Sequence, residues 1–254
     1  MIAQSEIKKQ FHQVCKVRYT KLGFTRQKNG YWRVVNDVLQ TFSLQFSRDG
    51  RNGRICFGIY PLCMDIKYVV NVGEYYVGQF DQNLTDWSFD KMLCSSAEEC
   101  FATTFFLIDS YLIPFFRKAV DCPSAFVEMV DLDFRFDSFR KKRLKQMGDV
   151  DEAEPIEIRT LLDSSKFYMY LKTRNYDCAQ KNIALIIQSK KESYERALKM
   201  EIDDIQWKNA YCQKLARAID RMENELSFLN GQNYTMIDSY LERQEKANLE
   251  RFKV

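Results

Sequence analysis

Residues Phe24 to Leu62 read FTRQKNGYWRVVNDVLQTFSLQFSRDGRNGRICFGIYPL, and this stretch decides the fold. Apolar and polar residues alternate in it with a period of two, which is typical of half-buried antiparallel strands. The residues predicted to share the buried face are Phe42, Leu44, Phe46, Ile55, Phe57 and Ile59. Helices elsewhere in the chain are expected to cover that face.

Turn signals divide the stretch into four predicted strands. Asn29-Gly30 is a strong hairpin signal, because both central residues of such a turn adopt positive φ, and Asn36-Asp37 is a second candidate. Asp49 to Gly53 forms a longer predicted loop. Two β-rich runs between Ile66 and Phe80 predict one or two further strands.

Four aromatic motifs carry a resemblance to a known family: LGFTR from Leu22, YWR from Tyr31, FSLQF from Phe42 and FGIY from Phe57. Together they resemble a bacterial family known only as domain of unknown function 4304, over roughly the first half of the chain. The resemblance implies a helix followed by an antiparallel sheet, with helices after it. It supplies no catalytic residues.

Helices are predicted on both sides of the sheet segment. Residues 4 to 22 form an amphipathic pattern that ends at Gly23, where positive φ is cheap only for glycine. Ser95 or Ser96 opens a strongly apolar helix that should lie against the sheet, and Pro114 predicts a kink in it. Residues 125 to 137 fit a helix and a strand equally.

The fold class predicted is α+β, with an N-terminal helix and an antiparallel sheet of four to six strands covered by helices, followed by an all-helical C-terminal part. The boundaries are an α+β domain over 1–147, a linker over 148–155 and a helical domain over 156–254. The helical part contains one hairpin that resembles a tetratricopeptide-like unit, without a second copy. The pattern leaves open whether 176–229 is one helix or two.

An apolar seam runs through residues 212–229. Its members are Cys212, Leu215, Ile219, Met222, Leu226 and Leu229, spaced by three and four. We expect this seam to pack within a helical hairpin, with self-association of the chain as the alternative.

Composition restricts the chemistry. The chain has 8 cysteines without a C-x-x-C pair and a single histidine, His12, so neither a histidine-centred triad nor a structural zinc site is expected. The formal net charge of +3 does not by itself indicate a nucleic-acid binder. We predict a soluble cytoplasmic protein with reduced thiols, no cofactor and no membrane association.

Two charged clusters motivate an alternative function. Asp131, Asp133 and Asp137 resemble an acidic metal site, although nearby arginines favour ordinary surface pairing. Arg140, Lys142 and Arg143 belong to a basic run that suits a helix end or a phosphate backbone. The alternative is therefore a nucleic-acid-binding protein, or a metal-dependent protein that processes nucleic acid.

The preferred prediction is a non-enzymatic module that binds another protein. We place its binding residues, Tyr31, Arg33, Gln45 and Tyr60, on a polar face of the sheet. Tyrosine and arginine are enriched among interface hot spots. Two other outcomes stay open: that face is simply solvated, or the C-terminal helices fold back and bury it.

Overall fold

The computed structural model describes residues 2–27, 30–64, 66, 75–80, 88–147, 164–201 and 204–252. The side chains of 136, 137, 139–147 and 164 lie outside that description. The chain forms two compact units, one of Met1–Val150 with Gln244–Val254 and one of Asp151–Arg243. The division falls in the predicted linker, but the last residues group with the first unit, which differs from the predicted domain 156–254.

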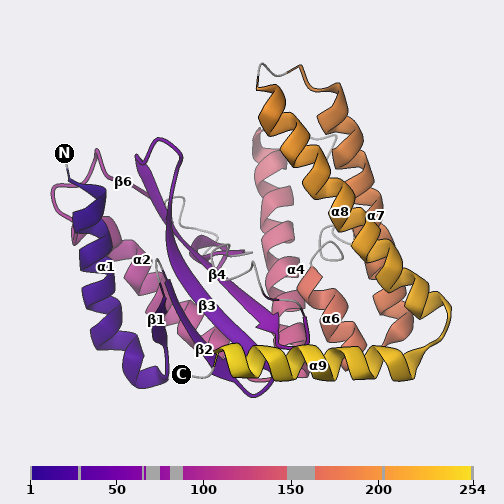
Figure 1. Cartoon of the computed structure of the whole chain (residues 1–254). Coiled ribbons are helices and arrows are strands. Elements are labelled where there is room, and N and C mark those ends of the chain that lie inside the picture. Colours follow the sequence, from indigo (N-terminus) through magenta and orange to yellow (C-terminus); the bar gives the residue numbers. More distant parts are fainter. Residues whose placement is uncertain are drawn as a thin grey trace. The chain divides into compact units, whose positions relative to one another are not determined.

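The first unit contains an antiparallel sheet in the order β1-β2-β3-β4-β5, with β6 also paired to β4 (Figure 1). Its strands are β1 Thr25–Gln27, β2 Gly30–Val35, β3 Val38–Phe46, β4 Asn52–Pro61, β5 Tyr75–Tyr76 and β6 Ser88–Asp90. The α+β class and the antiparallel sheet are thus confirmed. Most of the predicted strand region between Ile66 and Phe80 lies outside the described residues.

The hairpin turns set the register. Val35 pairs with Val38, so Asn36-Asp37 is a two-residue turn, and Asn36 has a φ of +48°. Gly30 pairs with Gln27 and starts β2, so it is a strand residue, while residues 28 and 29 of the expected Asn29-Gly30 turn region lie outside the described residues. A side chain on Gly30 would collide with β3, which explains the glycine there.

Helices surround this sheet in the first unit. They are α1 Gln4–Tyr19, η1 Thr20–Leu22, η3 Val77–Gln79, η4 Glu99–Phe101, α2 Ala102–Leu107, the π-helical η5 Ile108–Leu112, α3 Ile113–Lys118 and α4 Cys122–Met147. The open question over 125–137 is thereby answered as helix. Gly23 has a φ of +86° directly after η1, as its place in the sequence predicts.

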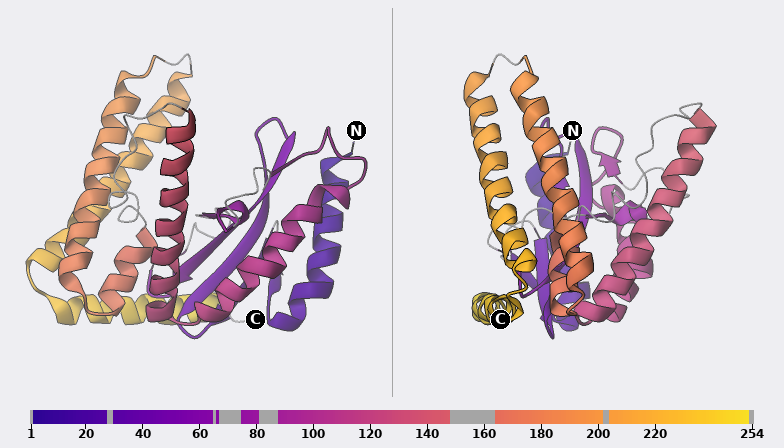
Figure 2. Two further views of the ribbon diagram at one scale, coloured as in Figure 1. Left: turned by 180° about the vertical axis from the view of Figure 1, so that it is seen from behind. Right: turned by 90° about the vertical axis from the view of Figure 1, so that its right-hand side faces the viewer.

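One face of the sheet packs on α1 and on the α2–α3 helix (Figures 1 and 2). Phe42 is 1% exposed and meets the ring of Phe11 edge-on at 6.5 Å. Phe57 is fully buried and its ring lies 5.9 Å from that of Phe115. The predicted apolar face is therefore confirmed as the core of this unit.

The helix that contains Pro114 is irregular just before this residue, where the sequence predicts a kink. Because proline has no N–H to donate, the helix cannot keep regular hydrogen bonding through it. A π-helical turn, Ile108–Leu112, directly precedes the segment that contains it. Residues Glu99–Lys118 are long and apolar enough to cross a membrane, but 56% of their most apolar window is buried, as in the core helix of a globular protein.

The other face of the sheet is covered at one end by the last turns of the chain. Trp32 of β2 meets Phe252 edge-on at 5.1 Å between ring centroids. Asn248 is 5% exposed and donates from Nδ2 to the carbonyl oxygens of Leu62 and Met64, both at 2.7 Å. The sequence leaves open whether the C-terminal helices bury this face; within the first unit, the last turns of α9 cover one end of it.

The second unit is helical. It contains α6 Ser164–Lys172, α7 Tyr176–Lys199, α8 Ile205–Asn230 and the first half of α9 Tyr234–Phe252. Residues 176–229 therefore form two helices. Lys191 forms an ion pair with Glu223, and Gln180 donates a hydrogen bond to Asn230. Since the later residue of α7 pairs with the earlier residue of α8, the two helices are antiparallel (Figure 2). Five of the six seam residues are buried in this unit, as intramolecular packing requires; Leu226 is half-buried.

Candidate functional site

The residues predicted to bind on the sheet do not share one face. Tyr31 pairs with Phe42, and Arg33 pairs with Gln40, so both point to the helix-covered face. Tyr60 pairs with Leu39 on the opposite face, where Gln45 also lies. The prediction of a common polar face is wrong, because the β2–β3 register sets Tyr31 and Arg33 against the core.

Tyr31 and Arg33 have structural partners. Tyr31 is 3% exposed, and its hydroxyl donates to the carbonyl oxygen of His12 at 3.1 Å. Arg33 donates from Nε to Oε1 of Gln40 at 2.7 Å, and its guanidinium lies 4.6 Å from the ring centroid of Phe24. Burial lowers the pKa of Arg33, and the charge of Arg117 lowers it further.

Gln45 and Tyr60 are on the other face but differ in exposure. Tyr60 is fully buried, and its hydroxyl lies over Gly58, where an added Cβ would collide with it. Gln45 is half-buried opposite Arg54. A partner could therefore reach Gln45 but not Tyr60 without a rearrangement.

The charged clusters are only partly described. Asp131 pairs with Arg135 one helical turn later at 2.9 Å, the surface pairing that the sequence suggests, and Asp133 is half-buried. The side chains of Asp137, Arg140, Lys142 and Arg143 lie outside the described residues. Among the residues that are described, no group of three His, Cys, Asp or Glu could hold a metal ion. The nucleic-acid alternative stays a prediction.

The cysteines of the sheet and its covering helices are unsuited to nucleophilic catalysis. All 8 are unbridged in the structure. Burial raises the pKa of Cys56 to about 11, and that of Cys15 beyond it. These thiols are therefore protonated at neutral pH, and the thiolate is the reactive form.

A pocket in the second unit is the better candidate. It has a volume of about 260 Å³ and is lined by α6, α8 and the start of α9. Its apolar side chains are Phe167, Leu171, Phe228, Leu229, Met236 and Ile237. Its polar side chains are Tyr168, Arg221, Asn224, Glu225, Tyr240 and Arg243. We call this site the helical pocket.

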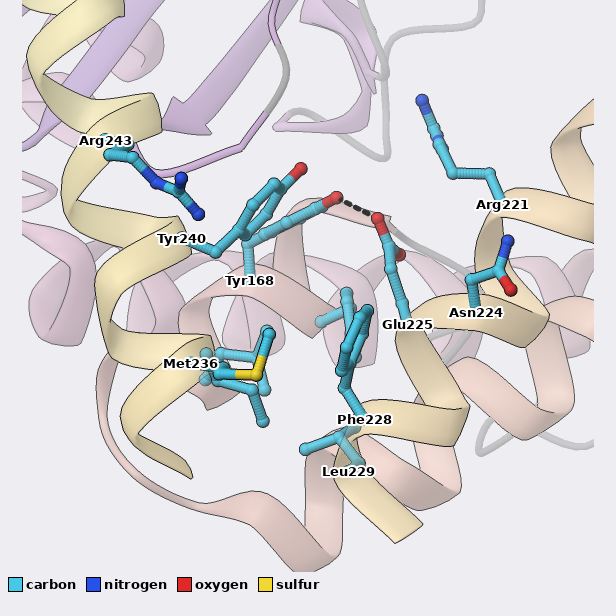
Figure 3. A pocket seen from close by; sticks show the side chains of 12 residues that line it. Tyr168, Arg221, Asn224, Glu225, Phe228, Leu229, Met236, Tyr240 and Arg243 are labelled. Carbon is cyan, nitrogen blue, oxygen red and sulfur yellow. Dashed lines mark hydrogen bonds between the residues drawn. The ribbon is translucent and has the colours of Figure 1, made fainter. Parts of the chain in front are cut away.

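The two kinds of side chain are separated in the helical pocket. Figure 3 shows Phe228, Leu229 and Met236 together, with the hydroxyls of Tyr168 and Tyr240 and the carboxylate of Glu225 beyond them. Phe228 is 46% exposed and Met236 is 51% exposed, so apolar surface reaches the solvent at the mouth. Ligand-binding cavities are typically lined by apolar side chains with a few polar groups, which is the composition of this site.

A partly buried hydrogen bond between two helices lies at the polar end of the helical pocket. The hydroxyl of Tyr168 donates to Oε1 of Glu225 at 2.8 Å, across from α6 to α8 (Figure 3). Burial raises the pKa of Tyr168 well above its ordinary value, and the negative charge of Glu225 raises it further. Tyr168 therefore remains a neutral donor at physiological pH and holds the carboxylate in place.

Positive charge gathers beside this end of the helical pocket. Arg221 lines it, and Lys214 lies seven residues earlier on α8, on the same helix face. Lys190 of α7 is half-buried and lies level with Arg221, because the neighbouring Lys191 forms an ion pair with Glu223 of α8 at 2.6 Å. Burial lowers the pKa of Lys190, and the charges of Arg221 and Lys214 lower it further. We call Lys190, Lys214 and Arg221 the basic cluster.

Comparison of the chain with family models, with curated proteins and with solved structures finds no match. The resemblance to domain of unknown function 4304 therefore remains a prediction from the aromatic motifs. The function has to be argued from the site itself.

The apolar patterns in the sequence include two residues that line the helical pocket, but they do not predict a cavity. Leu229 and Ile237 belong to the apolar pattern that predicts α8 and α9. Phe228 and Met236 are large apolar residues that lie off that pattern, next to a helix end. A helix packed along one apolar stripe does not require large apolar residues on its other faces. Phe228 and Met236 lie outside that stripe, and this position is the sequence signal for the helical pocket.

Proposed function

We propose that this protein is a binding module that holds a side chain of a partner protein in the helical pocket. The observation that carries the proposal is an apolar cavity with exposed Phe228 and Met236 at its mouth. Interface hot spots are typically large side chains that fill such cavities, with polar groups around them.

The volume supports a side chain rather than a whole small molecule. Pockets for drug-sized ligands span roughly 300–1,000 Å³. The helical pocket, at about 260 Å³, lies below that range. It can take one aromatic or large aliphatic group while the rest of the partner lies outside.

The polar end supports binding more than catalysis. Glu225 is the acidic side chain in the lining, and Tyr168 already donates to it. A general base needs a pKa near the working pH and access to the substrate proton. The Tyr168 phenol, with its raised pKa, does not meet the first requirement. Tyr168 and Glu225 instead shape the cavity.

Site-specific photocrosslinking tests the proposal. Benzoylphenylalanine in place of Phe228, in the full chain expressed in its host, should give a discrete adduct with one protein. The matched control is the same group in place of Phe134, which is 56% exposed in the first unit. Met236→Trp should abolish the adduct by filling the mouth, with an unchanged melting temperature. Equal adducts at both positions, or an adduct indifferent to Met236→Trp, would contradict the proposal.

A further inference from the structure

One member of the basic cluster, Arg221, lines the helical pocket, while Lys214 precedes it on α8 and Lys190 lies on the neighbouring α7. Lys214 and Arg221 are seven residues apart on α8, which corresponds to about 10.5 Å along the helix axis. Lys191 bonds Glu223 at 2.6 Å, so the neighbouring residue Lys190 is level with Arg221. Three cations from two helices therefore share one short strip of surface.

The positive charges of this strip are not neutralised by ion pairs among the described residues of the unit. Among the residues that the structure describes, none of Lys190, Lys214 and Arg221 forms an ion pair. On the same two helices, by contrast, Lys191 is paired with Glu223. Among the described residues of the lining, Glu225 is the one acid, against Arg221 and Arg243. The local charge around the helical pocket is thus positive.

The three cations also repel one another. Lys190 is half-buried, and the charges of Arg221 and Lys214 act on it. Like charges held close together cost free energy, and an opposite charge brought by a ligand relieves that cost. The arrangement is complementary to an anion that lies next to the apolar cavity.

We propose that the partner presents an acidic segment, in which a large apolar side chain enters the helical pocket and neighbouring carboxylates face the basic cluster. This inference rests on the proposed function and specifies the partner's chemistry. Carboxylates suit the site better than a phosphate backbone, because the cations span one short strip and adjoin a cavity sized for one side chain. Peptide recognition commonly combines an apolar anchor with such charge complementarity.

A display library of random short peptides, selected on the full-length protein, provides the test. Selected sequences should combine one large apolar residue with several Asp or Glu residues. A labelled peptide from the selection should then bind more weakly when Lys190, Lys214 or Arg221 is replaced by Gln, by roughly two- to fivefold for each. Lys181→Gln, an exposed site on α7, is the matched control and should leave affinity unchanged.

The outcomes separate this inference from the proposed function. Enrichment of apolar residues without acidic ones, abolished by Met236→Trp, would overturn the acidic partner and keep the binding module. Selection that yields no peptide dependent on Met236 would overturn both. Binding of a labelled oligonucleotide or of anionic lipid vesicles that is lost in the Gln variants, with no peptide binding, would reassign the basic cluster to those ligands.

Discussion

Asn248 lies 186 residues after Leu62 in the chain, and its Nδ2 donates to the Leu62 carbonyl oxygen at 2.7 Å. The same nitrogen donates to Met64 at 2.7 Å, so one amide satisfies two carbonyls at the end of β4. A buried acceptor left without a donor costs roughly 1–3 kcal/mol. The C-terminal residues are thus part of the first unit's stability.

Asn248→Ala should lower the free energy of unfolding by about 1–3 kcal/mol, because two buried carbonyls lose their donor. Denaturant unfolding monitored by tryptophan fluorescence gives the value, since Trp32 contacts the same helix end. Lys246→Ala, an exposed site two residues earlier, is the control and should change little. Equal stability of both variants would refute this role of Asn248.

The core of the sheet gives a larger effect. Phe57 is fully buried against Phe115 and Phe116, so Phe57→Ala should cost about 3–5 kcal/mol through lost burial and a cavity. Phe134→Ala removes the same group from a site that is 56% exposed and should cost far less. Thermal melts of both variants measure the difference; similar melting temperatures would show that the face assignment is wrong.

The sheet shows what could have been read from the sequence. A two-residue turn at Asn36-Asp37 pairs Val35 with Val38, and counting back along both strands pairs Arg33 with Gln40. That count already places Arg33 with the buried face. Alternation predicts which residues of one strand share a face, whereas the register between strands, which the turn fixes, decides which faces of two strands coincide.

Other features have no local signal. The contact of Asn248 with Leu62 joins residues 186 positions apart in the sequence, and periodicity cannot predict it. The helical pocket likewise depends on Tyr168 meeting Glu225 from another helix. The apolar seam predicts that α8 packs within a helical hairpin, whereas a cavity arises from the fit of individual side chains.

Thiol reactivity should follow burial. Cys94 and Cys178 are partly exposed, whereas the other six cysteines are buried. A thiol reagent at neutral pH should therefore label these two fastest in the native protein, and all 8 after unfolding without reductant. Mass spectrometry of the digested protein locates the labels. Rapid labelling of Cys15 or Cys56 would contradict the packing, since burial keeps both protonated.

Lys190→Met should not destabilise the protein. Burial and the charges of Arg221 and Lys214 lower the pKa of Lys190, so its charged form is less favourable in the folded state than in the unfolded chain. The variant should melt at the same or a higher temperature at pH 7. The gap should narrow as the pH rises through the lowered pKa of Lys190 and close above the ordinary lysine pKa, where the charge is lost in both states. Lys181→Met, exposed on the same helix, is the control. A clear loss of stability in Lys190→Met alone would argue for a structural role of this lysine.

Tyr168 should make the second unit sensitive to alkali. Its pKa is raised in the folded state by burial and by Glu225, so folding favours the neutral phenol. Below the tyrosine pKa of the unfolded chain, about 10, this stabilisation is fully present, and it is lost as the pH rises above that value.

Tyr168→Phe removes a hydrogen bond to a charged group and should cost about 1.5–3 kcal/mol at pH 7. Above pH 10 its deficit relative to the natural chain should shrink, because Phe cannot ionise. Urea unfolding by circular dichroism at pH 7 and above pH 10 measures both differences, with Tyr211→Phe, whose ring is 36% exposed, as the control. A deficit that is unchanged or grows with pH would mean that the hydroxyl of Tyr168 is not the donor to Glu225.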